Sequence, residues 1–107
     1  MNKKLNIKNL KQREIVPGFH GRFINGENIT WAFWEIKKDS SIPDHFHIHE
    51  QIMHVISGDF EFTINGLTSV FSEGDTIVIP SNIPHRGKAL TNCKIMDVFS
   101  PKREEYK

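Results

Sequence analysis

The stretch Phe60-Glu61-Phe62-Thr63-Ile64-Asn65-Gly66-Leu67-Thr68-Ser69-Val70-Phe71 decides the fold class of this chain. Its first five residues alternate between apolar and polar side chains, which is typical of a strand with one buried face. Asn65-Gly66 separates them from a second five-residue run, and this dipeptide favours a tight turn because both residues tolerate positive φ. The stretch therefore predicts an antiparallel β-hairpin.

Further runs rich in β-branched and aromatic residues lie on both sides of the hairpin, at 29–36, 76–79 and 94–99. Glycine-containing turns recur every eight residues through this part of the chain, at positions 58, 66 and 74. No stretch outside the polar first ten residues has a helical period. Short strands at this spacing predict an all-β sandwich or barrel.

The length and composition indicate one globular domain. The chain has 107 residues, of which 37% are hydrophobic and 25% charged, and this leaves no room for a second core. We expect a polar N-terminal segment over 1–14, a barrel over 15–100 and a charged tail over 101–107. Cys93 is the single cysteine, so the core forms without an internal disulfide.

Charge and hydropathy argue against nucleic-acid binding and against a secretory signal or membrane anchor. Lys and Arg number 14 against 13 Asp and Glu, a formal net charge of +1, so no basic excess exists to bind nucleic acid. Polar residues separate Leu5, Ile7 and Leu10, so the N-terminus has no apolar run typical of a secretory signal or a membrane anchor. We therefore expect a cytoplasmic protein.

A histidine-rich segment, His45-Phe46-His47-Ile48-His49-Glu50-Gln51, is the strongest chemical signal. In an extended chain His45 and His47 lie on one face, about 7 Å apart, and Gln51 shares their phase. Phe46 and Ile48 then lie on the opposite face, where they are expected to pack against the core. Two converging imidazoles favour a divalent metal ion.

A third histidine from elsewhere in the chain completes the expected site. His85 follows Pro84 and Pro80, and these prolines restrict the backbone that directs its side chain. The alternative is that the histidines are surface or hydrogen-bonded residues of a turn. His49 shares the phase of the pair, and its ligation stays open. His54 lies in the run 53–56, which we expect to be a strand, and we expect a packing or hydrogen-bonding role for its side chain.

The chain resembles the cupins through two motifs in the correct order. The first, G-x5-H-x-H-x3,4-E-x6-G, is matched by His45, His47, Gln51 and Gly58; the second, G-x5-P-x-G-x2-H-x3-N, is matched by Gly74, Pro80, Asn82 and His85. Gln51 stands where the acid is usual and Asn82 where a glycine is usual, and Asp39 and Ala89 replace a motif Gly and Asn. Asn82 is tolerable there because Asn accepts a left-handed backbone. The resemblance implies a small single-domain jelly-roll β-barrel with a central metal, usually a homodimer.

The segment 45–51, together with the ending 97–106, is similar to the small cupins of pectin and alginate breakdown. Those proteins convert 4,5-unsaturated monouronates to linear keto forms. The resemblance implies that His45, His47, Gln51 and His85 hold the metal. It further implies that Asp97, Phe99 and Arg103 line the pocket of a small anionic, carbohydrate-like substrate.

Three neutral imidazoles and a neutral amide leave the full +2 charge on the ion, which favours Lewis-acid chemistry. Ni, Zn, Mn, Co and Fe(II) all suit such ligands. In the expected mechanism Asp97 moves a proton, Arg103 clamps a carboxylate through two hydrogen bonds, and Phe99 packs on the sugar ring. The alternatives are an Fe(II)-dependent cupin dioxygenase and a non-catalytic module that binds a small ligand.

The run 29–36 also indicates assembly. Trp31 and Phe33 share one face, while Ala32, Trp34 and Ile36 share the other. These are more large apolar side chains than one face of a small barrel can bury. We therefore expect a homodimer that covers the surplus.

Overall fold

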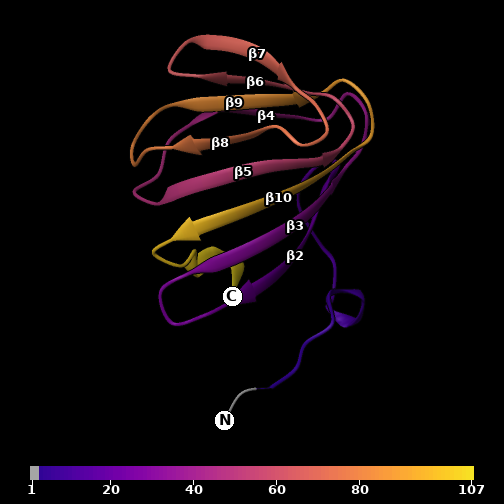
Figure 1. Cartoon of the computed structure of the whole chain (residues 1–107), viewed down its shortest axis with the longest axis vertical. Coiled ribbons are helices and arrows are strands. Elements are labelled where there is room, and N and C mark those ends of the chain that lie inside the picture. The colour runs from indigo at the N-terminus through magenta and orange to yellow at the C-terminus, as the bar shows by residue number, and fades with distance from the viewer. Residues whose placement is uncertain (1–2) are drawn as a thin grey trace.

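The structure is a computed structural model that describes residues 3–107; the first two residues of the expected segment 1–14 lie outside this range. Two antiparallel sheets pack together as a jelly-roll sandwich, as the alternating runs predict (Figure 1). The strands are β1 (Arg13–Val16), β2 (Phe19–Asn25), β3 (Thr30–Ile36), β4 (Ser41–His45), β5 (Glu50–Ser57), β6 (Phe60–Ile64), β7 (Leu67–Phe71), β8 (Thr76–Ile79), β9 (His85–Ala89) and β10 (Cys93–Ser100).

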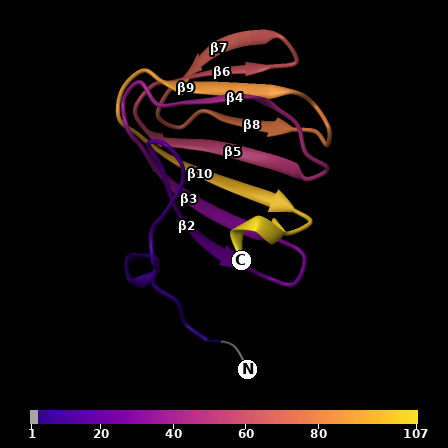
Figure 2. The same cartoon turned by 180° about the vertical axis from the view of Figure 1, so that it is seen from behind.

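The strand order places β4 and β5 in different sheets. The larger sheet runs β1-β2-β3-β10-β5-β8 and the smaller runs β4-β9-β6-β7. The connection between β4 and β5 therefore crosses from one sheet to the other, and it carries the histidine-rich segment. Seen from behind, β10 lies between β3 and β5, and the C-terminal turn lies beside β2 and β3 (Figure 2).

The predicted strands are confirmed, and four more are present. The hairpin is β6 and β7, and its turn has positive φ at Asn65 and Gly66. The runs 29–36, 76–79 and 94–99 correspond to β3, β8 and β10, and the expected strand at 53–56 lies within β5. The strands that were not predicted are β1, β2, β4 and β9, whose sequences contain histidine, proline or charged residues in place of clear alternation.

Alternation on β3 shows how the core is built. Ala32, Trp34 and Ile36 are buried, whereas Trp31 is 42% exposed on the outer face. The equivalent inward positions of the other strands supply the rest of one core between the sheets. Both faces of this strand were expected to be core or interface. The face of Ala32, Trp34 and Ile36 is core, and the face of Trp31 is not.

Two backbone positions explain how the chain departs from the cupin motifs. Asp39 and Asn82, which stand where the motifs have glycine, have φ of 71° and 63°. Asn and Asp are the non-glycine residues that best tolerate this region. The left-handed backbone expected at Asn82 is confirmed.

The tail after β10 folds back onto the body and includes a single 3-10 turn, η2 (Glu104–Tyr106). Three side chains hold its main chain. Arg13 donates to the carbonyls of Glu105 and Lys107, both at 3.2 Å, and Asn25 donates to that of Tyr106 at 3.0 Å. Thr30 Oγ1 accepts from the Arg103 amide at 2.8 Å. The charged tail is therefore docked beside the ends of β2 and β3.

The helices within residues 3–107 are too short to cross a membrane. They are η1 (Ile7–Asn9) and η2.

Candidate functional site

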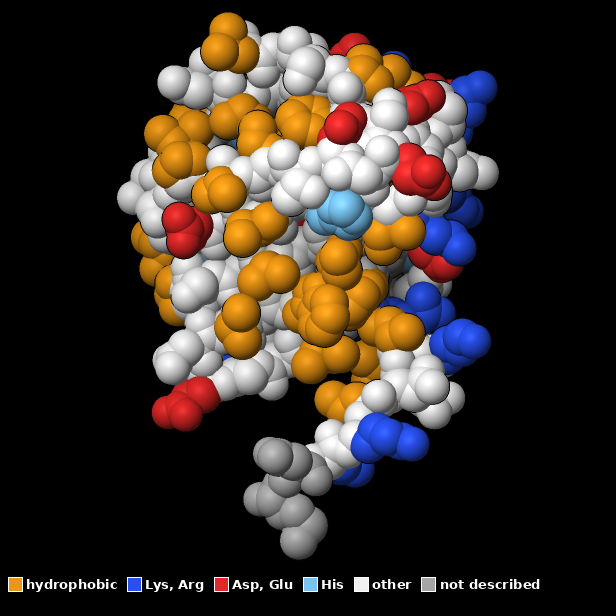
Figure 3. Space-filling view, viewed as in Figure 1, with side chains coloured by type: hydrophobic (Ala, Val, Ile, Leu, Met, Phe, Trp, Pro, Cys, Tyr) orange, Lys and Arg blue, Asp and Glu red, His pale blue; other side chains and the backbone are white. Residues whose placement is uncertain are grey.

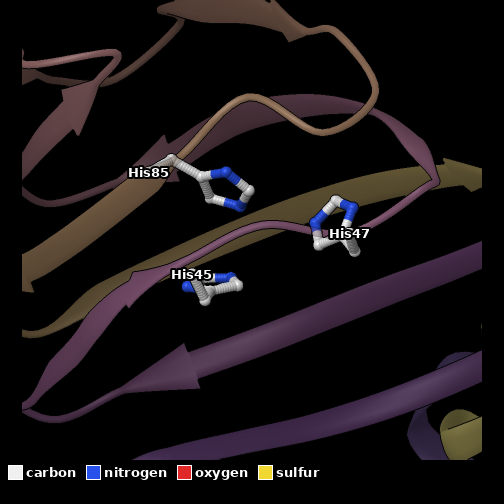
Figure 4. Close-up of side chains that lie close together, drawn as sticks. All are labelled: His45, His47 and His85. Carbon is white, nitrogen blue, oxygen red and sulfur yellow. The ribbon is translucent and has the colours of Figure 1, made fainter.

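Three imidazoles meet between the sheets. His45 and His85 are register partners on β4 and β9, with ring centroids 4.2 Å apart. The His47 ring lies 5.9 Å from that of His45 and 4.9 Å from that of His85. One nitrogen of each ring lies within 4.8 Å of the others, so the cluster could hold a metal ion (Figure 4).

The route by which His47 reaches the cluster differs from the expectation. β4 ends at His45, and His47 lies in the connection that follows, so the two histidines do not share one strand. Phe46 and Ile48 are 66% and 65% exposed, which makes the expected core packing of both residues wrong. The physical reason is that the chain leaves the sheet here, so no second layer covers the outward side of this connection.

A backbone carbonyl orients each imidazole. Nδ1 of His45, His47 and His85 lies at 2.8, 3.0 and 2.8 Å from the carbonyls of Pro43, His49 and Ile83, respectively. An N–H on Nδ1 that donates to a carbonyl leaves the lone pair on Nε2. This is the tautomer in which Nε2 binds a metal.

Burial favours the neutral form of His47 and of His85. Desolvation, assisted by the nearby Arg103 charge, lowers the pKa of His47 to about 4. Burial likewise lowers the pKa of His85, which is only 2% exposed. Nε2 of His85 is buried and has no hydrogen-bond partner within residues 3–107. A buried lone pair without a donor is an arrangement that a cation satisfies.

Gln51 adds a fourth donor beside the histidines. Its amide Nε2 donates to Asp97 Oδ1 at 2.9 Å, and its Oε1 lies 3.2 Å from His47 Nε2. A neutral imidazole has one N–H, so His47 cannot donate to both Gln51 and the His49 carbonyl. When Nδ1 of His47 holds the proton, His47 Nε2 and Gln51 Oε1 both carry lone pairs and face each other. Their separation suits two ligands of one ion with bonds of about 2.0–2.2 Å, so the donor set fits a divalent metal.

Asp97 is fixed behind this amide. Its second oxygen, Oδ2, accepts a hydrogen bond from Trp34 Nε1 at 3.0 Å. The carboxyl is 7% exposed, and burial raises its pKa to about 6 despite these two donors. Asp97 therefore titrates close to neutral pH.

A cavity of about 70 Å³ lies beside the histidine cluster. Asp97, Phe99 and Arg103 line it, as do Gln51 and the rings of His45 and His85. Apolar side chains from both sheets form most of the remaining wall. Asp97 and Phe99 occupy alternate positions of β10, and both side chains reach the cavity.

Arg103 reaches the cavity from the tail. Its guanidinium lies over the rings of Phe99 and Tyr106, 4.8 Å from each centroid. Its Nε donates to the carboxylate of Glu105. The side chain is 13% exposed, so the tail places a nearly buried positive charge beside the pocket.

His49 and His54 do not belong to the three-histidine cluster, and neither lines this cavity. The His49 ring lies 5.4 Å from that of His47 and 6.5 Å from that of Phe99. His54 Nδ1 lies 2.7 Å from Thr76 Oγ1, on the outer face of β5. This contact confirms the hydrogen-bonding role expected for His54.

Sequence reasoning missed three residues of this region. Tyr106 is buried and lines the cavity, and its ring stacks on that of Phe23 with the ring centroids 4.4 Å apart. Trp34 was expected to be core or interface, without its hydrogen bond to Asp97. Glu105 was taken as part of a charged tail. No local pattern marks the contacts of Tyr106 with Phe23 and of Trp34 with Asp97, because these partners lie far apart in the sequence. Glu105 pairs with Arg103, only two positions before it.

The Cupin domain family matches residues 32–99. The chain belongs to the cupin family. Its match covers β3 to β10 and so contains all four candidate metal ligands.

The cupin is also similar to individual proteins. It is 34% identical over 65 residues to the pectin degradation protein KdgF of Dickeya dadantii (strain 3937), a match over 60% of this chain and 59% of that relative. The structure of KdgF from Halomonas sp. superposes with a TM-score of 0.93 at 23% identity, covering 100% of both chains.

A RmlC-like cupin from Shewanella frigidimarina NCIMB 400 gives the same TM-score of 0.93 at 21% identity, covering 100% of this chain and 97% of that one. At these identities structural similarity establishes the jelly-roll fold only. The sequence match to KdgF of Dickeya dadantii, together with the structural match, makes this cupin a distant homologue of KdgF.

Proposed function

We propose that this cupin is a metal-dependent enzyme that converts a 4,5-unsaturated monouronate, or a similar small sugar acid, to its linear keto form. One observation carries the proposal. A single cavity brings together histidines of the metal cluster, the buried Asp97 and the tail residue Arg103. The distant homology to a pectin degradation protein supports a uronate as the substrate class.

His45, His47, Gln51 and His85 would hold the ion, and a divalent metal so bound would supply Lewis-acid polarisation of substrate oxygens. These four ligands are neutral, so they would leave the positive charge of the metal ion uncompensated. An anionic ligand therefore suits the site, and Ni, Zn, Mn, Co and Fe(II) all suit the donors.

The side chains around the cavity match the needs of the ring opening. The C1 hydroxyl loses a proton, the bond from C1 to the ring oxygen breaks to give an aldehyde at C1 and an enolate at C5, and the enolate becomes a ketone when C4 takes up a proton. We assign the proton transfer to Asp97, because a carboxyl with a pKa of about 6 both accepts and donates near neutral pH.

Arg103 binds the substrate carboxylate in this proposal, and Phe99 covers the sugar ring. The guanidinium is already positioned against the Phe99 ring. A pre-positioned charged donor binds a carboxylate more strongly than a mobile one does, because less side-chain freedom is lost.

The test is the loss of ultraviolet absorbance from the 4,5 double bond of an unsaturated monouronate. The protein is loaded in turn with Ni, Zn, Mn, Co and Fe(II). A faster loss than in the metal-free protein supports the proposal. If no metal gives a faster loss, this reaction is wrong, and a non-catalytic ligand-binding role takes its place.

We also propose a homodimer formed through the outer face of the larger sheet. Val78, Ile52, Val98 and Trp31 are successive cross-strand neighbours on β8, β5, β10 and β3. Val78 is 53% exposed, and Ile52 and Trp31 are 42% exposed. Figure 3 shows apolar side chains gathered over this face. A contiguous apolar face of this kind is typical of an interface.

A further inference from the structure

Glu105 offers the protein's own carboxylate to the guanidinium to which the proposed function assigns a ligand. Arg103 Nε donates to Glu105 Oε1. The Arg103 side chain is 13% exposed and that of Glu105 is 56% exposed. The carboxylate of Glu105 therefore meets the guanidinium from the solvent side.

The contacts of Arg103 limit where another anion can bind. The rings of Phe99 and Tyr106 lie against the guanidinium, so its hydrogen-bonding edges are what an anion must use. A carboxylate binds guanidinium through two parallel hydrogen bonds along one edge. Glu105 occupies Nε, so a ligand must either displace it or use the two terminal nitrogens beside a like charge.

The anchoring of the tail lets Glu105 leave without undocking the chain. The main-chain carbonyl of Glu105 accepts a hydrogen bond from Arg13 Nη2 at 3.2 Å, while its carboxylate is largely solvated. Rotation of the side chain alone frees the Nε edge. The positions of Arg103 and Tyr106 stay as the tail backbone sets them.

We propose that Glu105 is a specificity-determining residue that competes with a ligand carboxylate for Arg103. A neutral ligand gains no ion pair with Arg103, and a simple carboxylate exchanges one carboxylate partner for another. Net affinity then requires a ligand that adds contacts deeper in the cavity. The inference rests on the proposed function in assigning Arg103 to the carboxylate of the ligand.

The experiment compares Glu105→Gln with Glu104→Gln. Glutamine at 105 keeps an oxygen that accepts from Arg103 but removes the charge. Glu104 is exposed and pairs with Lys107 at 2.6 Å, so its variant removes the same charge from the same tail without touching Arg103. Sodium D-glucuronate is titrated into each protein, with D-glucose as the neutral control, and binding is followed by the nitrogen-15 NMR signal of Arg103 Nε–H.

We expect Glu105→Gln to bind glucuronate about two- to fivefold more tightly than wild type, the range for loss of a partly solvated charge. Glu104→Gln should bind as wild type does, and D-glucose should not respond to either change. An affinity in Glu105→Gln equal to or weaker than that of wild type would overturn the inference.

A further variant, Arg103→Ala, separates this inference from the function on which it rests. Its binding is followed by the tryptophan indole signals, because the arginine signal is lost. If Arg103→Ala binds glucuronate as wild type does, the carboxylate clamp itself is wrong. If Arg103→Ala abolishes binding and Glu105→Gln does not strengthen it, the clamp is correct and only the competition by Glu105 fails. Absence of binding in both wild type and Glu105→Gln overturns both.

Discussion

The amide of Gln51 donates to the buried carboxylate of Asp97 at 2.9 Å, and this bond turns the amide oxygen toward the histidine cluster. Asp97 is held in turn by Trp34. The two residues belong to neighbouring strands, β5 and β10. A residue predicted to move a proton thus also orients a candidate metal ligand.

Replacing Asp97 tests both roles. Gln51 and Trp34 donate to different oxygens of Asp97, and Asp97→Asn replaces one of these oxygens by an NH2 group, so one of the two donors loses its acceptor. We expect metal affinity to fall by about 10–100-fold, as for other partners of metal ligands, and turnover at saturating metal to fall by about 100-fold or more. Metal titration followed by the absorbance assay measures both. Unchanged affinity would contradict the orienting role.

Removing one histidine should empty the site. His47→Ala removes an imidazole that is a proposed metal ligand, so we expect loss of the metal. The imidazole contributes little to the core, so the β-sheet circular dichroism spectrum should not change. Elemental analysis of protein purified without a histidine tag gives the metal content. His54→Ala is the matched control, since it removes a histidine outside the cluster. Full metal content in His47→Ala would show that the assigned ligands are wrong.

Arg103→Ala should weaken substrate capture. A charge-assisted pair to a carboxylate contributes about 1.5–3 kcal/mol, so kcat/KM for the unsaturated uronate should fall by roughly one to two powers of ten. Metal content should not change. Lys102→Ala removes a positive charge from the neighbouring position of the tail and should retain wild-type kcat/KM. Equal losses in the two variants would indicate a general charge effect.

His47 should contribute a loss of stability to the metal-free protein on acidification. The pKa of His47 is lowered from 6.5 to about 4 in the folded state, so between these values the unfolded chain binds the proton more readily, and the free energy of unfolding falls as pH falls. Asp97, whose pKa is raised from 3.8 to about 6, has the opposite effect.

Urea unfolding in EDTA at pH 6.5 and 4.5 measures this loss. His47→Gln removes the imidazole and should make the loss smaller than in wild type, whereas Asp97→Asn should make it larger. Identical losses in wild type and His47→Gln would contradict the assignment.

Sedimentation should show a dimer at micromolar concentration. Ile52→Glu places a charge in the middle of the apolar face and should shift the protein to monomer. Leu67→Glu is the control, because Leu67 is 79% exposed on β7 of the other sheet. A wild-type monomer, or a dimer that Ile52→Glu leaves intact, would contradict this interface.

The strands that the sequence predicted are those in which local signals agree. In the hairpin 60–71, alternation, β-branched residues and an Asn-Gly turn all favour the same structure, and β6 and β7 form there. The strand β9, His85–Ala89, has no large apolar side chain at its inward positions. It forms because β4 and β6 pair with both of its edges, which no local pattern reveals.

The sequence alone determined the types of residue at the site and their spacing: two histidines in an H-x-H pair, a glutamine four residues after the second, and a histidine behind two prolines. It did not determine their geometry. His47 reaches the cluster because the chain turns after β4, and Arg103 reaches the cavity because Arg13, Asn25 and Thr30 hold the tail. These contacts join residues 73 to 94 positions apart. Only the packing of the sheets brings them together, because hydrogen bonds at such separation form after the chain has closed on itself.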